Sequence, residues 1–477
     1  MQSFIDRKLE LDFLGRMGES PRAGLLLVYG RRRIGKTSLL RHWAEGSGLP
    51  YTYWAAEKEP AALQRRKLFA GLFSGKGPET RFESWADCFA SIADVIGERR
   101  HILILDELPY AEDADPSLLS ALQHAWDQHF KSSQMLLVLC GSHVNIMERL
   151  LNRQSPLYGR FTGQWHLSAL PFGALKLFGP TWSADERVAF YATMGGVPAY
   201  LEWLRPELSY TENLRDVLLA PGSMFTAEPE FLLYDEVREP RNYLSILKAI
   251  GGGAHTLAEI QRGTTLDKSA LTVYLARLQE LYLVERRIPV SIPPQDRHRS
   301  RMGRYHLCDP YFRFYFRFLA PRMADVTYSP ERVLPGIREQ LRAFIGMSAW
   351  ELLCQQWIRY AGNAGVLDLV PEDVGAHWGP GVQVDAMGVS WTEKHMLLGE
   401  CKWQPEPVGR QILRDLVEVK APRVLAELEK AGRGGWRLLF AAFARSGFTE
   451  AAMQYASEQK IRLVDLDTLD RDLGTLT

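Results

Sequence analysis

Apolar residues gather in short unbroken runs through the first third of the chain, and helix-like segments separate these runs. Three runs lie at residues 25–29, 101–105 and 135–140, and two further strands are predicted at 51–55 and 165–170. Unbroken apolar runs of this length suit strands that are buried on both faces of a parallel sheet. Apolar residues at helical spacing from Phe4 to Leu14 predict a helix before the first strand. Residues 1–170 are therefore expected to form an α/β domain around a parallel sheet.

The middle of the chain has mainly helical patterns. Residues 171–235 are expected to form a helical lid, and residues 236–320 resemble a winged helix-turn-helix. In the latter, one helix is predicted at 241–250, and Thr256 with Glu259 forms a capping box that opens a second helix. A third helix has apolar residues at i, i+4, i+7 and i+11, namely Leu271, Leu275, Leu278 and Tyr282. Two strands are predicted after it, at residues 284–290 and 305–307.

The last part of the chain returns to alternating strands and helices. Residues 321–345 are expected to be a linker, and residues 346–477 a second α/β domain. Its predicted elements are a helix at 347–360, strands at 381–387 and 396–403 with a polar connection at 390–395 between them, and a helix at 410–430. A chain of 477 residues has room for this number of domains.

Composition and charge narrow the class of protein. Lysine plus arginine equals aspartate plus glutamate at 57 each, so any nucleic-acid site has to be a local one. The five cysteines are scattered without a C-x-x-C pair, which argues against a disulfide framework and fits a reducing compartment. The N-terminus lacks the apolar core of a signal peptide, and no window of 18 apolar residues occurs. We expect a cytoplasmic protein that makes no membrane contact.

The segment from Gly30 to Thr37 is the strongest chemical signal. It fits the pattern G-x-x-x-x-G-K-[ST] of the P-loop, and it lies between a predicted strand and a predicted helix, as that pattern requires. Its glycines allow backbone N–H groups to surround phosphate oxygens, while Lys36 faces the β- and γ-phosphates and Thr37 offers a hydroxyl to Mg²⁺. The candidate nucleotide-binding residues here are Gly30, Arg31, Arg32, Arg33, Ile34, Gly35, Lys36, Thr37 and Ser38.

Two later strands end in polar residues that favour hydrolysis of the nucleotide. Asp106 and Glu107 follow the apolar run at 101–105, and Ser142 follows the run at 135–140. Ligands of parallel sheets bind outside the carboxyl ends of the strands, where all three residues are predicted to lie. Asp106 is expected to hold Mg²⁺, Glu107 to polarise the attacking water, and Ser142 to sense the γ-phosphate.

Two other segments are weaker candidates for nucleotide contacts. Arg160, in a loop before the last strand of the first domain, is a candidate γ-phosphate sensor, and the alternative is an ordinary surface arginine. The turn Gly195–Pro198 in the helical lid is a candidate contact to the nucleotide through Pro198, and the alternative is a helix-breaking turn. The residues alone do not decide between these alternatives.

A group of arginines lies between the two strands of the winged-helix segment. Arg297, Arg299, Arg301 and Arg304 are a candidate contact to a phosphate backbone. The alternative is a solvated loop on a module that packs against the ATPase core, and the third helix lacks an evident run of base-reading polar residues.

The second α/β domain contains a second candidate active site. Glu400 and Lys402 point to the same face of one predicted strand, and an adjacent strand places Asp385 beside them. Two carboxylates and a lysine form a site for Mg²⁺ and an activated water, and Glu351 on the preceding helix is a candidate to complete the metal ligands. The alternative is an exposed hairpin with a cross-strand ion pair.

A second E-x-K sequence occurs at Glu418 and Lys420. It lies in a predicted helix, where residues two apart face away from each other. We therefore expect this second copy to take no part in the site.

The order of these motifs resembles the archaeal-type ATPase family of the STAND NTPases over nearly the whole chain. The C-terminal motifs are similar to those of PD-(D/E)xK nucleases, with Asp385, Glu400 and Lys402 on the motif positions. The matching segments are Phe4–Leu11, Gly30–Thr37 (Walker A), Leu103–Glu107 (Walker B), Cys140–Ser142, Ser155–Arg160, Gly195–Pro198, Asp309–Tyr315, Trp350–Glu351, Val384–Asp385 and Gly399–Trp403.

This resemblance implies an ATP- and Mg²⁺-dependent switch, able to hydrolyse ATP, whose winged helix transmits the nucleotide state. Its output would be a C-terminal restriction-endonuclease-like α/β domain that cleaves nucleic acid with a divalent ion. DNA is the substrate expected first. ATP-dependent assembly into a homo-oligomer would suit such a switch. Two other functions stay open: an ATP-dependent scaffold with a non-catalytic C-terminal domain, and a transcription regulator that reads DNA with its winged helix.

Overall fold

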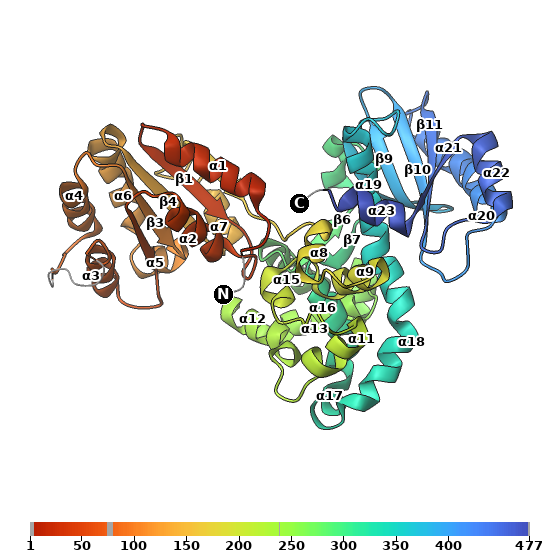
Figure 1. Ribbon diagram of the computed structural model, residues 1–477, viewed down its shortest axis with the longest axis horizontal. Helices are drawn as coiled ribbons and strands as arrows, with labels where there is room; N and C mark the ends of the chain where they lie inside the picture. Colours follow the sequence, from red (N-terminus) through yellow and green to blue (C-terminus); the bar gives the residue numbers. More distant parts are fainter. Residues whose placement is uncertain (1–3, 74–79, 238, 476–477) are drawn as a thin grey trace. The chain divides into compact units, whose positions relative to one another are not determined.

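The computed structural model describes residues 4–73, 80–237 and 239–475, and these form two compact units (Figure 1). The first unit contains the described residues up to Leu170 together with Val197–Ala199. The second contains Pro171–Gly196 and the described residues from Tyr200 onward. The chain thus leaves the first unit, returns to it for three residues, and leaves it again.

The first unit is built on a sheet of five parallel strands in the order β2-β3-β4-β1-β5. The strands are β1 (Gly24–Tyr29), β2 (Tyr51–Ala55), β3 (His101–Asp106), β4 (Met135–Gly141) and β5 (Gly163–His166). All residues of β1 and β4 are buried. This burial on both faces explains the unbroken apolar runs in the sequence.

The last strand of this sheet is displaced from its predicted position. β5 ends at His166, whereas the sequence pattern predicted a strand at residues 165–170. Leu167 and Leu170 are buried, at 1% and 2% exposure, without belonging to the strand. Because the buried apolar residues continue after β5, the sequence pattern predicted that the strand ends later than it does.

Seven helices accompany this sheet in the described part of the first unit. They are α1 (Lys8–Glu19), α2 (Lys36–Gly46), α3 (Ala61–Gly71), α4 (Trp85–Ile96), α5 (Leu108–Ala114), α6 (Leu118–Gln128) and α7 (Val144–Arg149). Leu14 of α1 and Leu40 of α2 share one core cluster with Leu26, Val28 and Ile104 of the strands. Alternate residues of β1 and β3 therefore face these two helices.

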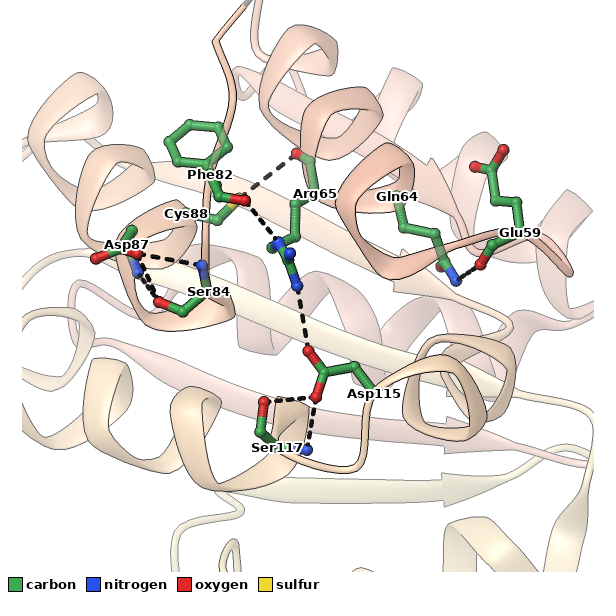
Figure 2. A network of polar contacts seen from close by, with 9 residues as sticks. All are labelled: Glu59, Gln64, Arg65, Phe82, Ser84, Asp87, Cys88, Asp115 and Ser117. Carbon is green, nitrogen blue, oxygen red and sulfur yellow. Dashed lines mark hydrogen bonds and ion pairs between the residues drawn. The ribbon is translucent and has the colours of Figure 1, made fainter.

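A buried arginine joins three helices of this unit (Figure 2). Arg65 of α3 donates to the carbonyl of Phe82, at 3.2 Å, and forms an ion pair of 3.1 Å with Asp115 after α5. Beside Phe82, Ser84 and Asp87 form a reciprocal capping box that begins α4. These bonds satisfy the polar groups where the chain enters and leaves the helices.

The second unit begins with helices, in the residues where the sequence pattern predicted helical structure. They are α8 (Leu175–Phe178), α9 (Ala184–Met194), α11 (Tyr210–Asn213), α12 (Glu228–Glu236), α13 (Pro240–Gly251), α14 (Leu257–Thr264) and α15 (Lys268–Glu280), while α10 (Pro198–Leu201) spans the division between the units. The capping box of Thr256 and Glu259 begins α14 as predicted. Strands β6 (Val284–Arg287) and β7 (Arg304–Leu307) pair antiparallel after α15.

Residues 321–345 do not form the predicted linker. They contain α17 (Met323–Tyr328) and α18 (Val333–Ile345), which follow α16 (Pro310–Phe314). Val333, Ile337 and Phe344 of α18 are buried. Their spacing places them on one face of the helix, so this segment belongs to the packed core of the unit.

The C-terminal part of the second unit contains a mixed sheet in the order β12-β11-β10-β9-β8. Its strands are β8 (Asp373–Trp378), β9 (Gln383–Ser390), β10 (His395–Lys402), β11 (Arg437–Ala444) and β12 (Ile461–Asp465). β8, β9 and β10 pair antiparallel, while β10, β11 and β12 pair parallel. The helices of this part are α19 (Glu351–Asn363), α20 (Arg410–Asp415), α21 (Ala421–Lys430), α22 (Glu450–Gln459) and α23 (Leu466–Leu473). The sequence pattern predicted β9 and β10 and missed the other three strands.

Candidate functional site

The loop from Gly30 to Gly35 joins β1 directly to α2, as a P-loop requires. Gly35 has a φ of 87°, in the left-handed region that glycine adopts at little cost. At Gly30 a Cβ atom would lie 2.3 Å from the carbonyl oxygen of Leu167, so only glycine fits there. Arg7, itself paired with Glu10, donates to the carbonyl of Ile34 at 2.8 Å and supports the loop from outside.

Lys36 points into this loop and is joined to two of the polar residues predicted from the sequence, to Ser142 directly and to Glu107 through Ser142. Its Nζ donates to the carbonyls of Gly30 and Arg31 and to Ser142 Oγ, each at 2.9 Å. Ser142 Oγ in turn donates to Glu107 Oε1 at 2.6 Å. Burial lowers the pKa of Lys36 below its ordinary value. The structure therefore joins Lys36, Ser142 and Glu107 in one hydrogen-bonded chain at the carboxyl ends of β3 and β4.

Asp106 lies at the same end of the sheet, beside Thr37. One oxygen of its buried carboxylate accepts hydrogen bonds from Thr37 Oγ1 and Tyr53 Oη, both at 2.7 Å, and the other accepts from the backbone N–H of Glu107 at 2.8 Å. A hydroxyl and a carboxylate in contact are oxygen donors of the kind that Mg²⁺ prefers. Thr37 and Asp106 therefore fit a Mg²⁺ ion bound with nucleotide phosphates.

Glu107 has two features that are typical of a reactive group. Its φ is 51°, a left-handed conformation that is uncommon for a residue other than glycine. Its Oε2 atom is buried and has no hydrogen-bond partner among the described residues, while Oε1 is held by Ser142. An unpaired buried carboxylate oxygen is a natural acceptor for a water molecule. This arrangement suits the predicted role of Glu107 toward the attacking water.

Tyr53 is a site residue that the sequence analysis missed. It lies on β2, next to β3, and its ring carries the Arg41 guanidinium 4.2 Å from the centroid. The only signal in the sequence was its place in a strand beside the one that ends in Asp106. Burial raises the pKa of Tyr53, and Asp106 raises it further, so its hydroxyl stays protonated and donates.

Changing Tyr53 to phenylalanine removes this donor without removing the ring. We expect the Mg²⁺ concentration for half-maximal ATP hydrolysis to rise about fivefold, because Asp106 loses one of the hydrogen bonds that fix its orientation. The maximal rate should stay within about twofold. Tyr51→Phe on the same strand is the matched control, since Tyr51 is exposed. Equal Mg²⁺ dependence of the two variants would exclude a positioning role for Tyr53.

The other candidate nucleotide-binding residues take different positions. Ser38 is exposed in the first turn of α2, and Arg32 donates to Tyr110 Oη at 2.7 Å. Pro198 belongs to the first unit, and its Cγ lies 3.8 Å from where a Cβ on Gly35 would be. Pro198 therefore lies beside the P-loop.

Arg160 forms an ion pair with a carboxylate of the same unit. Its guanidinium binds both carboxylate oxygens of Asp127 on α6, at 3.0 and 2.7 Å, and also the carbonyl of Pro156. In this arrangement Arg160 is a partly exposed residue of an ion pair, and its role as a γ-phosphate sensor stays a prediction.

The second candidate site lies where β9 begins and the antiparallel strand β10 ends, and it brings together Asp385, Glu400 and Lys402. Asp385 Oδ2 accepts the backbone N–H of Cys401 at 3.1 Å, and Lys402 Nζ lies 2.6 Å from Glu400 Oε1. Both carboxylates are buried, at 9% and 6% exposure. The alternative prediction of an exposed hairpin with an ion pair therefore does not describe this site.

The charges of this site influence one another strongly. Burial raises the pKa of Asp385, and the neighbouring Glu400 raises it further. Burial together with Asp385 raises the pKa of Glu351, at the start of α19, to about 8. Burial alone would lower the pKa of Lys402, but its attraction to Glu400 raises it above the ordinary value. Such mutual perturbation of carboxylates and a lysine is typical of functional sites.

Lys420 also belongs to this site, and the prediction that its E-x-K copy takes no part is half wrong. Lys420 Nζ lies 2.6 Å from Glu400 Oε2. Glu418 faces another way, as expected, and pairs with Arg414 at 2.7 Å. Helical periodicity correctly predicted that Glu418 and Lys420 face different ways. It could not predict that Lys420 contacts Glu400 on β10.

The donor chemistry of this site fits a divalent ion bound by two carboxylates. Among residues 4–73, 80–237 and 239–475, no three histidine, cysteine, aspartate or glutamate side chains are grouped so that they would hold a metal ion. Mg²⁺ commonly takes only one or two carboxylates and completes its shell with water and substrate phosphates. Asp385 and Glu400 supply that number.

The arginine loop between β6 and β7 packs against the C-terminal sheet. Arg297 forms an ion pair of 2.9 Å with Asp373 of β8, and the Arg304 guanidinium lies 4.8 Å from the ring centroid of Trp378. The N–H of Val290 donates to the carbonyl of Ala376 at 3.0 Å. Two of the four arginines thus hold the loop on the sheet rather than facing a phosphate backbone.

These features define the first unit as a P-loop ATPase domain. Consistent with this class, a family model described as an ATPase domain predominantly from Archaea matches residues 4–204. A second model, described as "Archaea bacterial proteins of unknown function", matches residues 315–413. In the described part of the chain, no helix has both the length and the apolar character needed to cross a membrane.

The chain is 30% identical to the uncharacterized protein MJECL04 of Methanocaldococcus jannaschii over 418 residues, which cover 87% of this chain and 91% of the relative. It belongs to the family of that protein, with an ATPase domain of the archaeal type. The uncharacterized ATP-binding protein MJ0423 of the same organism is 48% identical over 42 residues, which cover 9% of this chain and 71% of that protein.

Two solved structures are similar in part. The Walker-type ATPase PABY2304 of Pyrococcus abyssi has a TM-score of 0.48 and 21% identity, covering 66% of this chain and 97% of that chain. The ORC2 protein of Aeropyrum pernix, in ADPNP–ADP complexes, has a TM-score of 0.47 and 16% identity, covering 71% of this chain and 98% of that chain.

Proposed function

We propose that this protein is an ATP-operated switch of the STAND type that controls a metal-dependent, nucleic-acid-cleaving site in its second unit. The observation that supports the output most directly is the convergence of Asp385, Glu400 and Lys402 at the ends of two neighbouring strands. On this proposal the three-helix segment with β6 and β7 acts as a winged helix, and the C-terminal part is a restriction-endonuclease-like domain.

In the first unit, ATP binds with its phosphates surrounded by the loop from Gly30 to Thr37. When ATP binds, the Lys36 ammonium leaves the loop carbonyls and donates to phosphate oxygens instead. These hydrogen bonds are stronger because the phosphate oxygens are negatively charged. Thr37 and Asp106 are the residues that would hold Mg²⁺, which would supply charge stabilisation to the phosphoryl group when bound. Glu107 orients the attacking water through its unpaired Oε2, and Ser142 keeps its other oxygen in place.

In the second unit, Asp385 and Glu400 are the residues that would hold a divalent ion, which activates water and polarises a phosphodiester when bound. Lys402 is placed to hold the water or to neutralise charge on the phosphate. Glu351, protonated near neutral pH because of its raised pKa, would donate a hydrogen bond or bind the ion after losing its proton.

Helix α9 supports a connection between the two activities. Its Asp185 pairs with Arg445, whose backbone N–H donates to the carbonyl of Lys402 at 3.0 Å. The Arg445 guanidinium also lies 5.2 Å from the ring centroid of Trp403. At its other end, α9 leads through Gly195 to the three residues that belong to the first unit. Helix α9 is therefore the chain segment that leads from Pro198 to the residues that contact the strand end of Lys402.

The experiment that tests this proposal compares wild type with Lys402→Ala on single- and double-stranded DNA and RNA, with Mg²⁺ or Mn²⁺, and with or without ATP. Cleavage by wild type and a loss of at least about 100-fold in the variant are expected, because the variant lacks the lysine beside the reacting phosphate. Dependence of cleavage on ATP would support the switch.

Lys430→Ala is the matched control, because Lys430 is exposed at the end of α21. Equal cleavage by wild type and Lys402→Ala would contradict the assignment of the site. Binding of nucleic acid without cleavage under every condition would favour the scaffold. The transcription regulator is disfavoured because Arg297 and Arg304 are engaged with the C-terminal sheet.

A further inference from the structure

Glu400 is bound by two lysines at once, one at each carboxylate oxygen. Lys402 Nζ lies 2.6 Å from Oε1, and Lys420 Nζ lies 2.6 Å from Oε2. The Glu400 side chain is only 7% exposed, while those of Lys402 and Lys420 are 32% and 26% exposed. Both lysines thus extend from solvent to one buried carboxylate.

Lys420 owes its position to an irregular turn of its helix. Residues Leu416–Lys420 form a π-helical segment between α20 and α21, in which the N–H of Ala421 bonds to the carbonyl of Leu416. Leu416, Ala421 and Val424 are buried in the core beneath the sheet and fix this segment. The additional residue in the turn directs Lys420 toward β10, and such turns are frequent at functional sites.

The two ammonium groups bring two positive charges to the carboxylate that a metal ion would use. Each carboxylate oxygen keeps a second lone pair, but the ammonium charges repel a divalent cation, so the cation binds Glu400 more weakly while both lysines stay in contact with it. Lys402 lies on β10 two residues from Glu400, so its side chain stays on the same face of the sheet as Glu400. Lys420 comes from a separate helix and is the group that is free to turn toward another anion.

We infer that Lys420 is a positioning residue that withholds Glu400 from a divalent cation until a phosphodiester of the substrate draws its ammonium away. A lysine ammonium binds phosphate oxygens as a compact charge, so a substrate phosphate competes with Glu400 for it. Metal binding and substrate binding then depend on each other. The inference rests on the proposed nucleic-acid-cleaving function of this site.

The test measures Mn²⁺ binding to the full-length chain without nucleotide, by electron paramagnetic resonance. Wild type and Lys420→Gln are compared with and without phosphorothioate DNA, single- and double-stranded, which resists cleavage. In wild type, DNA should tighten Mn²⁺ binding about tenfold; in Lys420→Gln, binding should already be about tenfold tighter without DNA.

Three further variants make the result decisive. Lys430→Gln removes the same charge from an exposed position at the end of α21, the helix that follows Lys420, and should behave as wild type. Lys420→Arg keeps the charge and should also behave as wild type, which shows that the glutamine variant acts through charge and not through misfolding. Asp385→Asn identifies the Mn²⁺ signal that belongs to this site.

Equal Mn²⁺ affinity of wild type and Lys420→Gln in the absence of DNA would overturn the inference, as would a wild-type affinity that DNA leaves unchanged. If cleavage nevertheless requires Asp385 and Lys402, the proposed function survives and the inference alone fails. If Lys420→Gln binds Mn²⁺ as expected but no variant or wild type cleaves nucleic acid, the proposed function fails while the competition at Glu400 stands.

Discussion

Replacing Glu107 with glutamine should lower the turnover of ATP about 100-fold while leaving ATP affinity within about twofold of wild type. The amide keeps an oxygen that can accept the hydrogen bond from Ser142 Oγ, now 2.6 Å from the carboxylate, so the site keeps its shape. It loses the negative charge that polarises a water molecule. Phosphate release at steady state measures the turnover, and a fluorescent ATP analogue measures the affinity.

A matched control for this variant is Glu98→Gln, since Glu98 is exposed after α4. It removes one carboxylate charge from the same unit and should change neither quantity. Unchanged turnover in Glu107→Gln would remove Glu107 from the hydrolytic mechanism. Loss of ATP affinity would instead give Glu107 a structural role in the P-loop.

Replacing Arg187 with methionine should destabilise the contact between α9 and α23 by about 3 kcal/mol. Arg187 binds both carboxylate oxygens of Asp470, at 2.9 and 2.7 Å, and both side chains are 11% exposed. Removing the arginine leaves a buried carboxylate with Lys176 as its remaining cation, at 3.0 Å. Hydrogen exchange of the backbone amides in α9 and α23 measures the local free energy of opening.

The adjacent pair of Arg471 and Asp472 provides the control, because the Arg471 side chain is 69% exposed. Arg471→Met should change the stability by less than about 0.5 kcal/mol, as is usual for exposed ion pairs. Equal exchange rates in the two variants would mean that the Arg187–Asp470 pair contributes no more than a surface contact.

The sequence predicted the sheet of the first unit well because its central strands, β1, β3 and β4, are buried on both faces. Leu25 to Tyr29 and Met135 to Cys140 have unbroken apolar patterns that few other structures produce. The P-loop was equally clear, since its glycines, lysine and threonine are consecutive and each has a local task. Thr256 and Glu259 formed the predicted capping box because both partners lie within one turn.

The errors arose where long-range packing decides the structure. β8, β11 and β12 were missed: β8 has a mixture of polar and apolar residues, such as Asp373 and His377, that no simple periodicity describes. Lys420 was set aside because its own segment is helical, although its partner Glu400 lies on a strand 20 residues earlier. Tyr53 was missed because only the pairing of β2 with β3 brings its hydroxyl to Asp106.

The loop between β6 and β7 affects which C-terminal fragment of the chain would stay free of aggregation. β8 is an outer strand of the C-terminal sheet, and an outer strand with free N–H and C=O groups invites pairing with another molecule. The loop covers part of it through the bond from Val290 to Ala376 and the ion pair from Arg297 to Asp373. A C-terminal fragment that begins at residue 346 would lose this cover and expose a template for aggregation. A fragment that begins before β6 retains it.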